Sequence, residues 1–162
     1  MNNAMNDSTT KKARRLRSVV GALALIVAGS ASAEPQVITL TQIGCQFLES
    51  ENGVDHGFQA RSQADCKAVN ERTGEQRLAE SRVLDLTPGR YVFRVTNKNV
   101  PYDLGFWLRG DGLVNRAKLP SVSGGGLSTG KTRDYAVDLK PGEYVYSCPL
   151  NRTPNYRPVV SG

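Results

Sequence analysis

The sequence predicts an all-β, Greek-key sandwich of antiparallel strands with a short helix-containing insertion. Apolar and polar residues alternate in several short segments, which is the period of a half-buried strand. Two of these segments nearly repeat each other: residues 85–93 and 138–146 share the order Asp-Leu-x-Pro-Gly-x-Tyr-Val-aromatic. In each segment, Pro followed by Gly indicates a turn that leads into a strand. Two copies are too few for a repeat array, so we interpret them as matching parts of one sandwich.

The expected strands share this alternation and a supply of β-branched or aromatic side chains. They cover residues 36–41, 83–86, 91–97, 104–108, 135–139 and 142–148. The run at 104–108 is broken by Gly110, Asp111 and Gly112, and the last strand delivers Cys148 to a proline-rich loop.

The first 33 residues are typical of an export signal, so residues 34–162 are expected to be one mature domain. A basic stretch at 11–17 precedes a short apolar core at 19–28 and small residues that end at Ala33. The apolar core is too short to span a membrane, and the Arg14-Arg15 pair leaves the Sec and twin-arginine routes open. No cysteine follows the core to take a lipid. We therefore expect a soluble protein, periplasmic or secreted, after cleavage near Ala33.

Removing the signal also lowers the net charge. Of the 21 Lys and Arg and 15 Asp and Glu, five bases and one acid lie in the first 33 residues, which leaves 16 bases against 14 acids, or +2. No dense basic cluster with interleaved aromatic residues remains. The composition therefore argues against nucleic-acid binding.

The loss of strand pattern between about residues 46 and 82 indicates an insertion. Ser62 followed by Asp65 is a capping-box signal for a helix start, and Gly74 is the expected stop. Cys45 and Cys66 belong to this least strand-like region. In an exported chain with three cysteines we expect them to pair, which leaves Cys148 as the free thiol. Such a bond would contribute roughly 3 kcal/mol through chain entropy.

Residues 125–132, from Gly125 to Thr132, match the phosphate-binding pattern G-x-x-x-x-G-K-[ST]. That loop works where a helix begins just after it, because the helix N-terminus receives the phosphate. Here the following residues alternate as a strand. We therefore expect no nucleotide and interpret the pattern as a Gly/Ser hairpin loop.

Two stretches resemble the cupredoxin family. Residues 97–106 read Asn-Lys-Asn-Val-Pro-Tyr-Asp-Leu-Gly-Phe, and residues 142–151 read Gly-Glu-Tyr-Val-Tyr-Ser-Cys-Pro-Leu-Asn. In that family a strand ends in an Asn-containing turn with Pro-His, and a Gly-x-Tyr-x-(Phe/Tyr)-x-Cys strand leads to a His and then a Met. The resemblance covers about residues 83–158 and the first strand, and it implies a cupredoxin-like sandwich with copper as the candidate cofactor.

Only one of the four copper ligands that the resemblance implies is present. Cys148 falls on the cysteine ligand, whereas Tyr102 and Asn151 stand where the two histidines belong and Tyr156 roughly where the axial Met belongs. A blue-copper centre needs two imidazoles and a thiolate. A phenol titrates near pH 10 and an amide nitrogen is not a ligand, so the ligand positions are degenerate.

His56 is the one histidine of the chain. The simpler interpretation is a solvated loop histidine and a buried, inert Cys148 thiol. The alternative is that His56 folds over the Cys148 loop and completes a soft copper(I) site, with Asp103 or Tyr156 nearby.

No catalytic constellation is present in the sequence, so we do not expect an enzyme. The expected function is that of an exported cupredoxin-like binding protein that handles copper or iron, or docks on a periplasmic metal-handling protein, as the resemblance implies. The alternatives are a copper electron carrier that uses Cys148 with non-standard ligands, and a metal-free structural interaction module. A docking surface is expected at one end of the sandwich, formed by Tyr102, Tyr146, Pro154 and Tyr156.

Overall fold

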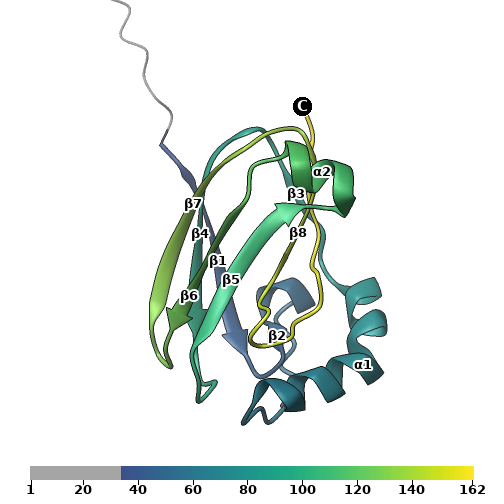
Figure 1. The fold of residues 1–162 in the computed structure, drawn as a ribbon, viewed down its shortest axis with the longest axis vertical. Coiled ribbons are helices and arrows are strands. Elements are labelled where there is room, and N and C mark those ends of the chain that lie inside the picture. Colours follow the sequence, from purple (N-terminus) through teal and green to yellow (C-terminus); the bar gives the residue numbers. More distant parts are fainter. Residues whose placement is uncertain (1–33) are drawn as a thin grey trace, which may run out of the picture. The chain divides into compact units, whose positions relative to one another are not determined.

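The computed structural model describes residues 34–162, so the predicted signal peptide lies outside the described residues. The strands are β1 (Gln36–Ile43), β2 (Gln46–Phe47), β3 (Leu84–Leu86), β4 (Gly89–Asn97), β5 (Leu104–Gly110), β6 (Val122–Leu127), β7 (Thr132–Leu139), β8 (Gly142–Ser147) and β9 (Pro158–Val160) (Figure 1). The helices are α1 (Gln63–Glu80), α2 (Gly112–Lys118) and the 3-10 turn η1 (Glu49–Glu51). The prediction of an all-β sandwich with a helix-containing insertion is confirmed.

The strands form two sheets with mixed strand directions. One sheet has the order β2-β1-β4-β7 and the other the order β3-β9-β8-β5-β6. β1 pairs with β4 in parallel, as does β3 with β9, so the prediction of a purely antiparallel sandwich is wrong. Parallel neighbours need a long connection between them, and the insertion between β1 and β3 supplies one.

The two sheets meet across a core of aromatic rings. Phe106 is in van der Waals range of Tyr135 and Tyr146, with ring centroids 5.0 and 5.9 Å apart. Phe47 meets Tyr146 and Tyr156 edge to face at 5.5 and 5.8 Å. Each ring buries a large apolar area, and the tilted and edge-to-face contacts add to that stabilisation.

The two matching sequence segments make the same contacts, one in each sheet. The Tyr91 hydroxyl accepts the N–H of Thr87 at 3.3 Å and donates to its carbonyl at 3.0 Å. The Tyr144 hydroxyl does the same at Lys140, at 3.1 and 3.0 Å. A tyrosine that bonds back to the backbone upstream fixes the turn before its strand, a device also found in other sandwiches.

Helix α1 begins where the sequence predicts and ends later. The capping box is present, with the Ser62 N–H donating to Asp65 at 2.8 Å. The prediction that Gly74 stops the helix is wrong, because α1 continues to Glu80. A glycine inside a helix costs about 1 kcal/mol. The contacts of Arg77, one turn further on, offset that cost, and the buried Gly74 lies close to Pro154.

Helix α2 is not predicted by the sequence, because its residues pack no buried side chain and show no apolar period. The Gly-rich residues 125–132 join β6 to β7, which lie in different sheets, so they form a connection between sheets and not a hairpin. A strand follows them, as predicted. Between residues 34 and 162, no helix has the length and apolar character needed to cross a membrane.

Candidate functional site

Cys148 lies fully buried at the end of β8 and is the unpaired thiol. Its sulfur accepts the N–H groups of Gly105 at 3.3 Å and Asn151 at 3.2 Å. Burial raises the pKa of the Cys148 thiol, and these backbone hydrogen bonds only partly oppose that rise. Cys148 is therefore protonated at neutral pH and is a poor nucleophile and metal ligand in this state.

Tyr102 occupies the first of the two predicted histidine positions. The buried Asn97 holds its loop: the side-chain amide donates to the carbonyls of Val100, Tyr102 and Leu127 at 3.1–3.2 Å. Burial raises the pKa of the Tyr102 phenol, and the nearby Cys148 raises it further. Tyr102 is therefore a neutral phenol at neutral pH, not an anionic ligand.

Asn151 occupies the second predicted histidine position and is fully buried. Its side-chain oxygen accepts the N–H of Cys45 at 3.0 Å, and its side-chain nitrogen donates to the carbonyl of Ile43 at 2.8 Å. Gln42, also fully buried, donates to the Gly105 carbonyl at 2.8 Å. Both ends of the Asn151 amide are thus used in joining the Cys148 loop to the end of β1.

The predicted disulfide between Cys45 and Cys66 is confirmed. The Cys66 sulfur lies 3.3 Å from the Asn151 side-chain oxygen and 3.9 Å from the Tyr102 hydroxyl. The disulfide therefore contacts both positions at which the resemblance places an imidazole. We call this arrangement of Cys45, Cys66, Tyr102 and Asn151 the disulfide plug.

Tyr156 and His56 both contact Glu51. The fully buried Tyr156 hydroxyl donates to one oxygen of Glu51, and the His56 Nε2 lies 2.7 Å from the other. The His56 ring also stacks on Phe58, with centroids 5.4 Å apart. These contacts leave the hypothesis of a mixed Cys148 and His56 site without support.

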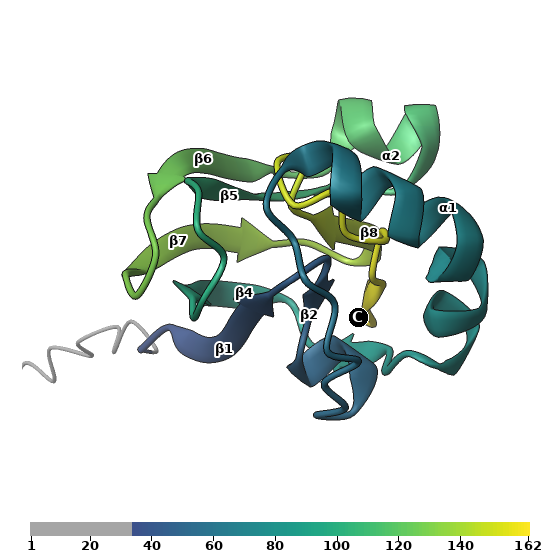
Figure 2. The ribbon, with the colours of Figure 1, turned by 90° about the horizontal axis from the view of Figure 1, so that it is seen from below.

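Glu51 is the centre of a buried ion-pair cluster that the sequence does not reveal. Arg77 donates to both of its oxygens, at 2.9 and 2.6 Å, and also to the Cys45 carbonyl at 3.1 Å. The Arg77 guanidinium lies 4.8 Å from the centre of the Phe58 ring. Both charged side chains are about 5% exposed. Together with Tyr156 and His56, this Glu51 cluster fastens the insertion to the sandwich. Figure 2 shows helix α1 of the insertion lying along the outside of the sandwich.

The residues present do not fit a copper centre. Of the groups that the resemblance assigns to the metal, Asn151 is committed to the backbone and Tyr156 to Glu51, while Tyr102 is a neutral phenol. Asp103 is exposed. Within residues 34–162, no group of three or more His, Cys, Asp or Glu side chains is placed to hold a metal ion.

The predicted aromatic docking end is wrong for Tyr146 and Tyr156, whereas Tyr102 and Pro154 are partly exposed. Tyr146 and Tyr156 are fully buried in the core, and Tyr102 is half-buried against the disulfide. Alternation along β8 correctly placed Tyr144 and Tyr146 on one face, but that face points inward. An open apolar groove lies elsewhere, over β5 and β6.

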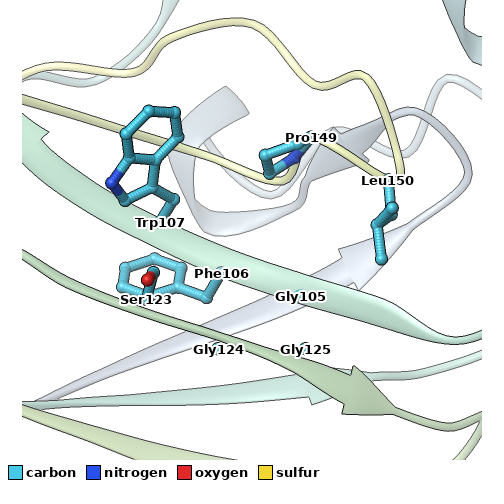
Figure 3. Close-up of a pocket in the computed structure, with 8 residues that line it drawn as sticks. All are labelled: Gly105, Phe106, Trp107, Ser123, Gly124, Gly125, Pro149 and Leu150. Atoms are coloured by element: carbon cyan, nitrogen blue, oxygen red, sulfur yellow. The ribbon is translucent and has the colours of Figure 1, made fainter.

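That groove has a volume of about 360 Å³ and is lined by Gly105, Phe106, Trp107, Ser123, Gly124, Gly125, Pro149 and Leu150. Figure 3 shows Trp107 at one end and Leu150 at the other, with three glycines between them that carry no side chain. No motif in the sequence identifies this groove. The Gly-rich stretch of β6 was the available signal, and we interpreted it as a loop.

Alkaline pH is expected to destabilise the protein. Burial raises the pKa of Tyr146 and Tyr156, and the charge of Glu51 raises that of Tyr156 further. Above pH 10 the unfolded state loses these protons while the folded state keeps them, so the free energy of unfolding falls. Each of these two tyrosines should lower the free energy of unfolding by about 1.4 kcal/mol per pH unit. Denaturant unfolding between pH 8 and 12 measures this, and a stability that stays flat above pH 10 would contradict it.

The fold is thus a two-sheet sandwich in which the positions that the resemblance assigns to copper ligands carry Cys148, Tyr102, Asn151 and Tyr156. No family model and no curated protein sequence matches the chain. Among solved structures, auracyanin B is 12% identical with a TM-score of 0.49, over 80% of this chain and 92% of its own. Fet3p, a multicopper oxidase that functions in iron import, is 13% identical with a TM-score of 0.37, over 80% of this chain and 32% of its own. Identities this low transfer no function.

Proposed function

We propose that this chain is an exported, non-enzymatic binding domain that works through its protein surface and without a bound metal. The disulfide plug is the observation that carries the proposal. Cys148 is fully buried beside Asn151, and the Cys66 sulfur of the disulfide contacts both Asn151 and Tyr102, so protein atoms occupy the positions of the two expected imidazoles. A metal would have to displace them and break the hydrogen bonds of Asn151.

Two further observations support the exported, non-enzymatic part of the proposal. Disulfides persist in oxidising compartments outside the cytosol, so the Cys45–Cys66 bond fits an exported protein. The single histidine of the chain contacts Glu51, and the Cys148 thiol accepts hydrogen bonds from backbone N–H groups. Nucleophilic catalysis needs a base within reach of the nucleophile, and His56 does not fill that role here.

Docking on a partner that itself handles copper or iron stays within this proposal, since docking requires no ligand set on this chain. The domain would contribute shape, charge and apolar surface. Such a role places the specificity in the side chains around the open groove and not at Cys148.

A copper titration tests the proposal. The purified protein and a Cys148→Ala variant are titrated with copper(I) and copper(II) while visible absorption and thermal stability are followed. We expect no thiolate-to-copper absorption band and no change in Tm. By comparison, a ligand at one hundred times its Kd stabilises a protein by about 2.7 kcal/mol. A band and a stabilisation that both disappear in Cys148→Ala would overturn the proposal in favour of metal handling or electron transfer.

A further inference from the structure

Arg109 on β5 is a buried cation without a carboxylate partner in residues 34–162. It is 6% exposed, and its terminal nitrogens donate to Ser147 at 3.1 Å and Asn155 at 2.8 Å, while its Nε is buried without a hydrogen bond. None of the ion pairs formed within residues 34–162 involves Arg109. Buried charges in proteins are normally paired, so Arg109 is an unusual group that an external anion would stabilise.

A second cation stands beside it. The guanidinium carbons of Arg109 and Arg116, the latter on α2, lie 4.0 and 5.7 Å from the centre of the Trp107 ring. Burial lowers the pKa of Arg109, the charge of Arg116 lowers it further, and Asp111 opposes this only in part. The Trp107 end of the groove is therefore positive, and an incoming carboxylate would relieve the repulsion between the two arginines.

The same tryptophan lines the apolar groove, so the positive end and the groove are continuous. The floor between Trp107 and Leu150 is made of glycine backbone, which allows another chain to approach closely (Figure 3). Leu113 and Val114, on the same helix as Arg116, are 86% and 64% exposed and add exposed apolar surface to α2.

We propose that this groove binds an extended acidic segment of a partner protein. An apolar side chain of the segment would lie between Trp107 and Leu150, and a neighbouring carboxylate would pair with Arg116 and Arg109. This inference rests on the proposed function and names the partner's chemistry. The charge of the site favours such a segment over the basic residues 11–17 of this chain, which would be repelled.

Trp107 is the only tryptophan of the chain, so its fluorescence reports on the groove directly. The probes are short synthetic peptides that alternate leucine with glutamate, leucine with lysine, or serine with glutamate. The leucine–glutamate peptide should give a saturable change that weakens as salt is added, because its ion pairs are screened. The other two should bind at least tenfold more weakly.

Two variants test the two halves of the site. Gly125→Leu should abolish binding by filling the groove. A Cβ added at Gly125 meets only the Leu104 carbonyl, at 4.0 Å, so we expect the fold to be retained. Arg116→Gln removes an exposed charge and should weaken binding about tenfold. The controls are Ala136→Leu and Arg72→Gln, which introduce the same side chains at exposed positions on β7 and α1 and should bind normally.

The inference is overturned if the leucine–glutamate peptide gives no saturable response, if the leucine–lysine peptide binds equally well, or if Gly125→Leu binds normally. The copper titration measures metal binding at Cys148, and its result does not depend on the fluorescence of Trp107. A copper absorption band together with intact peptide binding would overturn the metal-free function but would leave the proposal of a peptide-binding groove standing. If neither a copper band nor peptide binding is seen, only the proposal of a peptide-binding groove is overturned.

Discussion

Replacing Arg77 with methionine should lower the free energy of unfolding by about 3–5 kcal/mol, as expected when one partner of a buried ion pair is removed. Glu51, which is about 5% exposed in this structure, would lose the charge that now neutralises it. Tyr156 and His56 would still contact it, but a neutral phenol cannot replace a guanidinium that donates to both oxygens. Urea unfolding followed by circular dichroism measures the loss.

The control for this prediction is Arg94→Met. Arg94 also binds a carboxylate, that of Asp134, with two hydrogen bonds of 2.8 Å, but both side chains are about half exposed. Exposed pairs contribute at most about 1 kcal/mol, so this variant should lose little. Adding Glu51→Gln to Arg77→Met should recover part of the stability, because the uncompensated charge is gone. Equal losses in Arg77→Met and Arg94→Met would contradict the buried cluster.

Removing the disulfide with Cys45→Ala and Cys66→Ala should lower the free energy of unfolding by roughly 3 kcal/mol. The bond closes a loop of 21 residues, and the chain-entropy estimate for a loop of that length is of this size. The same unfolding experiment measures the effect as a lower midpoint. An unchanged midpoint would mean that the Glu51 cluster alone holds the insertion in place.

Much of the sandwich can be predicted because its signals are local. The Pro-Gly turns, the alternating strands and the capping box at Ser62 each lie within a few residues of chain, where backbone preferences decide the outcome. The parallel pairings of β1 and β3 could not be predicted in this way, because strand direction depends on where the insertion sends the chain. Gly74 failed as a helix stop because contacts distant in sequence override a weak local preference.

The site was harder to predict because its decisive residues are polar and distant in sequence. Four polar or charged residues would each be assigned to the surface by residue type: Gln42, Glu51, Arg77 and Asn151. All four are buried, and each forms hydrogen bonds to a residue distant in the sequence. The partners Arg77 and Glu51 are 26 residues apart, and Asn151 is 106 residues from Cys45. Only the predicted disulfide indicated that the insertion returns to the sandwich. It did not indicate that the bond covers the Cys148 end.

The rate at which Cys148 reacts with a thiol reagent tests most directly whether the disulfide plug closes this end of the sandwich. In the intact protein, Cys148 should react only as fast as global unfolding allows, as measured against the urea-unfolded chain. In the Cys45→Ala, Cys66→Ala protein, where Cys148 is the one cysteine left, the reaction should be at least about a hundredfold faster, in line with the roughly 3 kcal/mol that the bond contributes. Cys148 that reacts in the intact, folded protein as fast as in the unfolded chain would contradict a closed site.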